Sequence, residues 1–448
     1  MEAEGEGSAL STGSPTSGPT AAALLPAASP KPCPLTPSTS TPNRPPSPGG
    51  TTTRAGEGPA GGGTVMKLKL HRADQGKASL GDSVDYEVIG EQDEQSLRQV
   101  QADELKELRR KHETQLKLER CKPPVVPESV GLENPIGAHN CFLNVVLQSL
   151  WHLTAFRRLL LQDTHPHRCQ SKGCIACSMR GLFTQYKFGT YAHLPPQEVR
   201  EVVSCVFMEQ QRFQVDQMDD AAELLDAMLL QLHADQAEAG DQAAHSCQPP
   251  CISHTAFGAE IIERSTQCKQ CHQVGAHVET YIQLLHYLPS SLLLEEGDVH
   301  ARMRVHLESE VRTCSECAEA SPPAHSELPI QKHLCTVPPI VAFVLAWGND
   351  RSTREQLTSI TTNMLQTLNL DQVYRMAADV RGPHPYSLRG LICFYGHHYV
   401  AYFWNRVLDE WVYLDDSYVR PLGSWANVQQ TIIDGRHMPL VLFYVRSP

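Results

Sequence analysis

The sequence lacks an excess of positive charge. Its 448 residues include 38 Lys and Arg against 50 Asp and Glu, which gives a formal net charge of −12 at pH 7. A nucleic-acid-binding protein needs a basic surface to bind the phosphates. This charge balance therefore argues against a nucleic acid as partner and favours a neutral or basic protein partner.

Two kinds of hydrophobic segment are also missing. No apolar run is long enough to span a bilayer, so we expect no membrane association. The N-terminal stretch MEAEGEGSALSTGSPTSG is acidic and polar and does not resemble a secretory signal. We therefore expect a cytoplasmic or nuclear protein, in which the 15 cysteines favour metal binding or catalysis over a disulfide framework.

Large apolar residues are scarce at the start of the chain, so residues 1–65 are predicted to be a disordered low-complexity tail. Residues 66–120 form a charged region that ends in a predicted helix over 94–120, where Pro and Gly are absent. Its thin apolar stripe of Leu105, Leu108 and Leu116 is typical of a solvated helix or a short coiled coil. The proline-rich residues 121–130 are predicted to be a linker.

The remaining residues, 131–448, are predicted to form one domain, and we find no internal repeat. Helical patterns come first, in FLNVVLQSLWHLTAFRRLLLQ and MDDAAELLDAMLLQLHAD. Strand-like runs follow, such as IVAFVLAW, LRGLICFYGHHYVAYFW and PLVLFYVR. Helices that precede strands indicate an α+β fold.

Cys141 follows the turn-like GLENPIGAHN and begins an apolar helix. The free N–H groups and the dipole at a helix N-terminus stabilise a thiolate, which makes Cys141 a candidate nucleophile. The alternative is a buried structural cysteine.

A catalytic thiolate needs a base and a group that orients the base. The stretch FYGHHYVAYFWNRVLDEWVYLDDSYV offers two histidines and two aspartates on what reads as a hairpin. Because neighbouring strand residues point to opposite faces, we expect only one of His397 and His398 to face the cysteine. In the same way, only one of Asp415 and Asp416 is expected to face that histidine.

These stretches resemble the motifs of the ubiquitin-specific proteases. GLENPIGAHNCFLNVVLQSLWHL resembles their Cys box, and YGHHYVAYF with EWVYLDDSYV resembles their His box. FQVDQMDDAAELLDAML resembles the acidic helix between the boxes, and HMPLVLFYVR resembles the closing strand. The resemblance covers residues 128–448 in family order and is greatest to a divergent branch with a Cys-Phe-Leu-Asn box.

The resemblance implies a papain-like fold with thumb, palm and zinc-ribbon fingers. It also implies hydrolysis of isopeptide bonds at the C-terminus of ubiquitin, with ubiquitin and ubiquitinated proteins as partners. By motif, Cys141 is the nucleophile, His398 the base, and Asp415 the orienting acid, with Asp416 as the second choice.

The Cys box departs from the family pattern in one respect. The oxyanion-stabilising asparagine usually lies five residues before the cysteine, whereas Asn134 lies seven before Cys141. Asn134 is the expected oxyanion residue and Asn140 is the other candidate. Since losing one such donor costs roughly 10²–10³ in rate, a weak or inactive relative that binds ubiquitin as an adaptor is the alternative function.

Two CxxC pairs suit a tetrahedral structural zinc ion. They fall where the resembling family carries its zinc ribbon, and their ligands would be Cys268, Cys271, Cys314 and Cys317. Without the Cys and His boxes, a zinc-dependent interaction module would be a third possible function.

Two further clusters offer metal ligands, with core cysteines and surface histidines as the alternative. The first comprises His165, His167, Cys169, Cys174 and Cys177. The second comprises His245, Cys247, Cys251 and His254.

Asp220 and Glu223 are three residues apart and are expected to share one helix face. Such a charged face is often merely solvated. The resemblance implies instead that these acids hold the extended, arginine-containing tail of ubiquitin, because a carboxylate suits a guanidinium through charge-assisted hydrogen bonds.

Overall fold

The computed structural model describes residues 66–68, 86–88, 91–120, 127–162, 173–237, 247, 250–320, 326–349 and 351–447. The predicted tail over 1–65 lies outside this range. Strands β1 (Met66–Leu68) and β2 (Tyr86–Val88) pair in an antiparallel ribbon, and α1 (Glu91–Arg120) follows. Of the predicted apolar stripe on α1, Leu116 is buried, whereas Leu105 and Leu108 are exposed. The predicted linker contains the 3-10 helix η1 (Pro127–Ser129).

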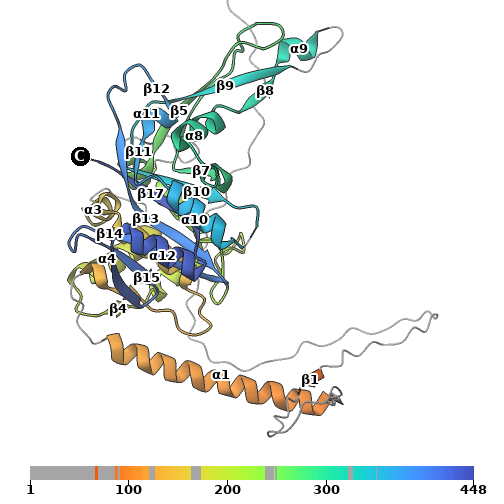
Figure 1. Cartoon of the computed structure of the whole chain (residues 1–448). Helices are drawn as coiled ribbons and strands as arrows, with labels where there is room; N and C mark the ends of the chain where they lie inside the picture. Colours follow the sequence, from red (N-terminus) through yellow and green to blue (C-terminus); the bar gives the residue numbers. More distant parts are fainter. Residues whose placement is uncertain are drawn as a thin grey trace, which may run out of the picture. The chain divides into compact units, whose positions relative to one another are not determined.

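An eight-stranded sheet forms the centre of the fold (Figure 1). Its strands run in the order β16, β15, β14, β13, β17, β10, β7, and β11 pairs with β13. All neighbours are antiparallel except the parallel pair β10 and β7. The bounds are β7 (Leu285–Pro289), β10 (Ile340–Ala346), β11 (Thr367–Asn369), β13 (Pro385–Tyr395), β14 (His398–Asn405), β15 (Glu410–Asp415), β16 (Tyr418–Gly423) and β17 (Met438–Arg446).

The sheet is apolar on both faces, as the alternation of β10 shows. Ala342 belongs to one hydrophobic cluster, and its neighbour Phe343 belongs to the other. A strand buried on both faces reads as a continuous apolar run, which explains IVAFVLAW in the sequence. Helices therefore cover both faces.

The first cluster packs against a helical layer that precedes the sheet in sequence. Its helices are α2 (Cys141–His152), α3 (Thr154–Gln162), α4 (Ile175–Phe188), α5 (Gln197–Val206), α6 (Ala221–Gln236) and α7 (Ile252–Phe257). Helix α2 is buried at every residue from Cys141 to Trp151. A helix that is covered all round lies in the core, and each large apolar side chain buried there contributes about 1.5–3 kcal/mol.

The second cluster packs mainly against α10 (Arg354–Asn363) and α12 (Trp425–Gly435). Shorter elements complete this side of the sheet: η2 (Ser290–Leu293), α8 (Val299–Leu307) and α11 (Leu370–Val373). A small parallel pair consists of β3 (Gly131–Leu132) and β4 (His193–Leu194). Strand β3 precedes the loop that leads to Cys141, and β4 precedes α5.

A second, five-stranded sheet extends from the central domain (Figure 1). It consists of β5 (Ala259–Ser265), β6 (Val278–Gln283), β8 (Val311–Thr313), β9 (Glu327–Leu334) and β12 (Arg375–Met376). Helix α9 (Ser315–Glu319) follows β8 at the far end. Helices first and strands later agree with the predicted α+β class.

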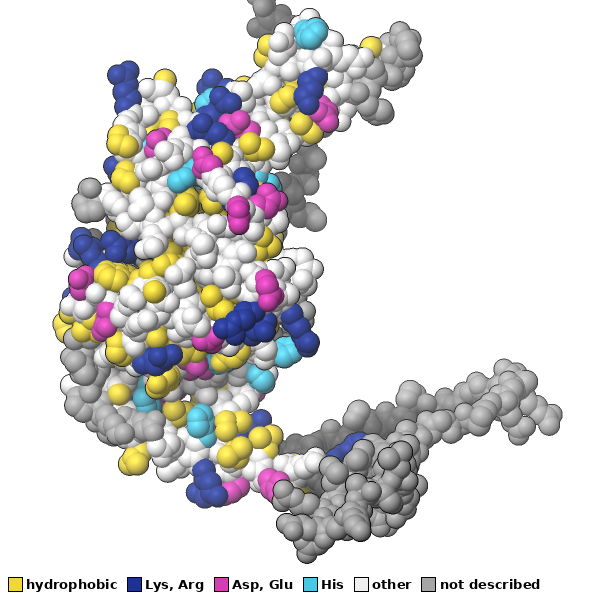
Figure 2. All heavy atoms as spheres, in the orientation of Figure 1, with side chains coloured by type: hydrophobic (Ala, Val, Ile, Leu, Met, Phe, Trp, Pro, Cys, Tyr) yellow, Lys and Arg dark blue, Asp and Glu magenta, His cyan; other side chains and the backbone are white. Residues whose placement is uncertain are grey.

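On the face drawn in Figure 2, acidic and basic side chains of the described residues are interspersed. Among the helices that the structure describes, none is both long enough and apolar enough to cross a membrane.

Candidate active site

Cys141 is the first residue of α2 and is 3% exposed. The loop before it contains two left-handed positions, Gly137 with φ 84° and His139 with φ 51°. The loop is two residues longer than the five-residue spacing usual in the resembling family. The positive φ angles allow this longer loop to reverse its direction, and Asn140 precedes α2 as its N-cap. The sulfur thus lies at the N-terminal end of a fully buried helix.

The two histidines differ because one of them lies in a turn. Gly396 and His397 connect β13 to β14 and have φ angles of 48° and 71°. Such a two-residue turn requires positive φ at both positions. His397 is exposed there, whereas His398 begins β14 and is half-buried. The sequence argument from strand alternation was therefore wrong for His397, although the two residues are indeed in different environments.

His398 contacts acidic groups on one side and the thiol on the other. Its Nε2 lies 2.7 Å from Oδ1 of Asp415, and the Cys141 thiol is near enough to raise its pKa. Burial lowers the pKa of His398, but the hydrogen bond to Asp415, the nearby Cys141 and the charges of Asp416 and Asp415 outweigh burial and raise it to about 10. The imidazole is therefore protonated at neutral pH.

The second aspartate was expected to point away from His398, and this expectation was wrong. Oδ2 of Asp416 lies 3.9 Å from the same Nε2. Asp416 follows the end of β15 and has a φ of 51°, so it lies in the turn to β16, where strand alternation does not apply. Burial raises its pKa, and hydrogen bonds from Asn134 and Asn144 oppose the shift.

Asp416 connects the His box to the Cys box. Its two carboxylate oxygens accept hydrogen bonds from the side-chain amides of Asn134 and Asn144, each over 2.8 Å. Its backbone oxygen accepts a hydrogen bond from the Gln148 side chain over 3.0 Å. Two of these donors lie on α2, so the turn that carries Asp416 is attached to the helix that carries Cys141.

Asn134 lies between these two parts of the site. Its side-chain oxygen accepts the backbone N–H of Asn140 over 2.9 Å, while its amide nitrogen donates to Asp416. Asn134 therefore connects the two ends of the loop that precedes Cys141. One of its two amide hydrogens is already used in the hydrogen bond to Asp416. Asn140 is buried, with 2% of its surface exposed.

Arg200 on α5 also belongs to the site and was not identified from the sequence. It is 1% exposed, and its guanidinium lies 4.7 Å above the ring of Phe142, the neighbour of Cys141. It donates hydrogen bonds to three backbone oxygens, those of Phe213, Gln214 and Gln217. The only feature of the sequence that could have indicated a buried Arg200 is its place beside Val199 and Val203, on the buried face of α5.

The predicted substrate-binding acids are arranged differently from the expectation. Asp220 lies outside α6 as its N-cap, and its carboxylate accepts the backbone N–H of Glu223 over 2.9 Å. The two residues therefore do not share a helix face. Glu223 forms an ion pair of 2.6 Å with Arg212, in which both side chains are partly exposed.

Two more side chains extend this acidic group. Asp226 lies one turn further along α6, and burial raises its pKa although Arg212 opposes the shift. Tyr287 on β7 is 52% exposed, and the burial of its other part, together with the charges of Asp226, Asp220 and Glu223, raises its pKa. The start of α6 thus presents several carboxylates in one place.

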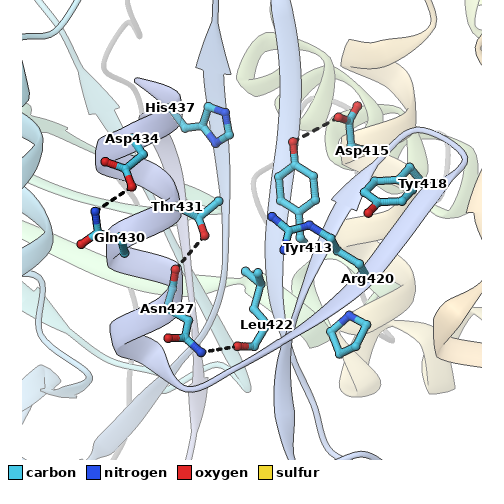
Figure 3. Close-up of a pocket in the computed structure, with 12 residues that line it drawn as sticks. Tyr413, Asp415, Tyr418, Arg420, Leu422, Asn427, Gln430, Thr431, Asp434 and His437 are labelled. Atoms are coloured by element: carbon cyan, nitrogen blue, oxygen red, sulfur yellow. Dashed lines mark hydrogen bonds between the residues drawn. The ribbon is translucent and has the colours of Figure 1, made fainter.

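A hollow of about 650 Å³ lies on the other side of Asp415, between α12 and strands β15 and β16 (Figure 3). Tyr413 stands in it and donates its hydroxyl hydrogen to Oδ2 of Asp415 over 3.1 Å. Arg420 lies 5.1 Å from the centre of the Tyr413 ring. Asp415 therefore receives a hydrogen bond from each side, which fixes the carboxylate beside His398.

The four predicted finger cysteines come together at the far end of the second sheet. Their sulfurs all lie within 4.8 Å of one another, with Cys268 to Cys317 and Cys271 to Cys314 both at 3.7 Å. Among the described residues, Leu328 is the only other buried residue in their hydrophobic cluster. The four sulfurs are arranged so that they could hold a metal ion.

The two weaker clusters are described in part. His165, His167, Cys169 and His245 lie outside the described residues. Cys174 is the N-cap of α4 and accepts the backbone N–H of Cys177 over 3.4 Å. Cys247, Cys251 and His254 come together with His233, which the sequence did not indicate.

Comparisons with known proteins agree with the motifs. A family model described as "Ubiquitin carboxyl-terminal hydrolase" matches residues 130–444, more than half of the chain. "Ubiquitin carboxyl-terminal hydrolase 54" of Rattus norvegicus is 30% identical over 330 residues, which are 71% of this chain and 20% of that protein. "Ubiquitin carboxyl-terminal hydrolase 53" of Homo sapiens is 29% identical over 327 residues, 70% of this chain and 30% of that protein. The chain thus spans less than a third of the length of these curated relatives.

A solved structure shares the fold. The SAGA Ubp8/Sgf11/Sus1/Sgf73 DUB module bound to ubiquitin aldehyde includes a chain with a TM-score of 0.52 and 16% sequence identity. The likeness covers 73% of this chain and 71% of that one. At this identity the likeness concerns the fold alone, and the predicted thumb, palm and fingers are confirmed.

Proposed function

The chain belongs to the ubiquitin carboxyl-terminal hydrolase family, and from this premise we propose that it is a thiol-dependent deubiquitinase that hydrolyses isopeptide bonds at the C-terminus of ubiquitin. The observation that carries the proposal is the contact of His398 with both Cys141 and Asp415. A thiolate, an imidazolium and a carboxylate in series form the catalytic arrangement of cysteine proteases.

In the proposed reaction, His398 holds the proton taken from the Cys141 thiol, and the Cys141 thiolate attacks the carbonyl carbon of the ubiquitin C-terminal glycine. His398 gives this proton to the lysine amine as the C–N bond breaks. It then takes a proton from the water that hydrolyses the remaining thioester and releases the Cys141 sulfur. Asp415 holds the imidazole in place and stabilises its charge. The backbone N–H of Cys141, together with the Asn134 or Asn140 side-chain amide, would stabilise the oxyanion.

We further propose that the carboxylates at the start of α6 bind the extended, arginine-containing tail of ubiquitin. Asp220 and Glu223 are the predicted residues, and Asp226 lies next to them. The Tyr399 hydroxyl lies 3.4 Å from the Asp220 carboxylate and belongs to the strand that begins with His398. The acidic group is therefore connected to the strand of the catalytic histidine.

The finger cysteines are proposed to hold one structural zinc ion. Four sulfurs without an open position suit a tetrahedral structural site. The role of this zinc would be to join the turn of Cys268 and Cys271 to α9, which carries Cys317. The ion would take no part in the hydrolysis.

The test is covalent capture by a ubiquitin that carries a C-terminal electrophile. The wild-type chain should form one adduct, and Cys141→Ala should form none. Cys335→Ser is the matched control and should react like wild type. It changes a half-buried thiol that belongs to no cluster that can hold a metal among the described residues. An adduct that survives Cys141→Ala would contradict the proposal.

A second candidate function is favoured by the engaged amide of Asn134. If neither Asn134 nor Asn140 serves the oxyanion, the chain would bind ubiquitin with little turnover and act as an adaptor. Turnover of a panel of diubiquitins, measured beside the affinity of Cys141→Ala for ubiquitin, separates the two functions. Binding without turnover would favour the adaptor.

A cytoplasmic or nuclear location also remains a proposal, which microscopy of the tagged chain would test.

A further inference from the structure

Two helices of the first helical layer end or begin at one compact group of four side chains. His233 lies in the last turn of α6, Cys247 follows in the connecting segment, and Cys251 and His254 lie at the start of α7. One ligand atom from each lies within 4.8 Å of all the others. The group has two sulfurs and two imidazoles.

The distances within this group fit a metal ion at its centre. Sγ of Cys247 lies 3.1 Å from Nδ1 of His254, and Sγ of Cys251 lies 3.6 Å from Nδ1 of His233. A tetrahedral zinc ion with Zn–S near 2.3 Å and Zn–N near 2.0–2.1 Å separates its ligand atoms by roughly 3.3–3.8 Å. The four side chains would need to move only slightly to bind zinc.

Backbone hydrogen bonds indicate that both sulfurs act as acceptors. The N–H of Cys251 donates to Sγ of Cys247 over 3.0 Å, and the N–H of His254 donates to Sγ of Cys251 over 3.4 Å. Such N–H groups stabilise a metal-bound thiolate, because the negative charge on the sulfur strengthens the hydrogen bonds that it accepts.

Hydrophobic packing does not account for this group. Cys247 and Cys251 are each 5% exposed and His233 is 7% exposed. Among the residues that the structure describes, the hydrophobic cluster around them contains one other buried residue, Ala237. Polar side chains that are collected and buried with so little apolar surface are typical of a small metal-stabilised element.

We propose that His233, Cys247, Cys251 and His254 bind a structural zinc ion that is separate from the ion in the fingers. The site joins the C-terminal end of α6 to α7. At its other end α6 carries Glu223, and α7 leads directly into β5 of the finger sheet. The ion therefore holds together the segment between the proposed ubiquitin-tail site and the fingers.

The first test is the zinc content of the purified full-length chain. Cys247→Ser combined with Cys251→Ser should contain one zinc equivalent less than wild type, whereas the matched control Cys335→Ser should contain as much as wild type. Combining the serine pair with Cys268→Ser and Cys271→Ser should remove a further equivalent, because the two sites are independent. An unchanged zinc content in the first variant would overturn the proposal.

A second variant keeps the test decisive if the serine pair does not fold. His254→Cys replaces one nitrogen ligand by a sulfur and should retain the full metal content. After exchange of zinc for Co²⁺, its sulfur-to-cobalt charge-transfer absorption should exceed that of wild type, since this site would have three thiolates instead of two. The finger site contributes equally to both spectra. Equal absorption in the two proteins would show that residue 254 does not bind the metal and would overturn the proposal.

Discussion

The side-chain amide of Asn134 donates a hydrogen bond to the carboxylate of Asp416 over 2.8 Å. Asn144 on α2 binds the other oxygen of the same carboxylate. Asp415, the preceding residue, instead binds His398. Two adjacent aspartates therefore have different contacts: Asp415 orients the histidine, and Asp416 attaches the His box to the loop and helix of Cys141.

This difference predicts different effects for two matched substitutions. Asp416→Ala would leave the buried amides of Asn134 and Asn144 without an acceptor, and each such loss costs about 1–3 kcal/mol. We expect its free energy of unfolding to fall by about 2–4 kcal/mol, and turnover to fall with it. Asp415→Ala should abolish most turnover, and it should also lose the stability that protonated His398 contributes, so its destabilisation should shrink as the pH rises through about 10. The destabilisation by Asp416→Ala should persist there, because the loss of the amide acceptor does not depend on that proton. Urea denaturation of both variants at neutral and alkaline pH checks this, and the same pH dependence in both would contradict it.

The pH dependence of the site should depend on Asp415. The pKa of His398 is raised from 6.5 to about 10 in the folded protein. Its protonated form therefore contributes stability that is fully present below about pH 6.5 and is lost as the pH rises through about 10. In Asp415→Asn, the pKa should fall, so the alkaline limit of ubiquitin-ester hydrolysis should move down by about one unit or more. An unchanged alkaline limit would mean that Asp415 does not set this pKa.

The two histidines should differ in their effect on rate. His398→Ala should lower kcat by roughly 10²–10⁴, as loss of a general acid–base does. The control at position 397 should be His397→Asn, because asparagine tolerates the left-handed φ of 71° at that turn. It should keep kcat within about threefold of wild type. Steady-state kinetics on a ubiquitin C-terminal amide compare them, and equal losses would reject the assignment of His398.

Local signals in the sequence were enough to predict part of this site. The turn before Cys141 and the apolar run after it predict a helix that starts at the thiol, and the CxxC spacing predicts the sulfur group of the fingers. The sequence could not distinguish the roles of Asp415 and Asp416, because the partners of Asp416 lie 272 and 282 residues away. Such contacts depend on how α2 packs against β14 and β15.

Tertiary packing also explains the other differences. His233 joins Cys251 and His254 only because α6 and α7 pack together. His397 lies in a turn because β13 and β14 are joined by only two residues. Two residues are too few to interrupt the alternation of side chains that is typical of strands. The sequence argument therefore assigned His397 to a strand.

Removing the finger metal should affect binding more than chemistry. Cys268→Ser combined with Cys271→Ser should contain one zinc equivalent less than wild type. It should raise KM for ubiquitin substrates, because the end of the finger sheet would lose its order. The rate at which a small alkylating reagent modifies Cys141 should not change. A variant that loses no zinc would remove this site, and one with a changed alkylation rate would show that the effect extends to the thiol.

The last prediction concerns how Glu223 can bind a ubiquitin arginine while it is paired with Arg212. Both side chains are partly exposed, and such a surface pair contributes only about 0–1 kcal/mol. An incoming guanidinium that meets Glu223 beside Asp226 gains about 1.5–3 kcal/mol from its charged hydrogen bonds. The ubiquitin arginine is therefore expected to replace Arg212 as the partner of Glu223.

Two substitutions with opposite expected effects test this exchange. Glu223→Ala should raise KM for ubiquitin substrates about tenfold, since roughly 1.4 kcal/mol is tenfold. Arg212→Ala should leave KM unchanged or lower it, because the carboxylate is then free for ubiquitin. Asp219 is unsuitable as a control, because its charge acts on the buried Arg200. Glu201→Ala on the exposed side of α5 is a better one and should leave KM unchanged. If Arg212→Ala raised KM as much as Glu223→Ala, the pair itself would be the feature that matters, holding the loop of Arg212 against α6, and Glu223 would not bind the tail.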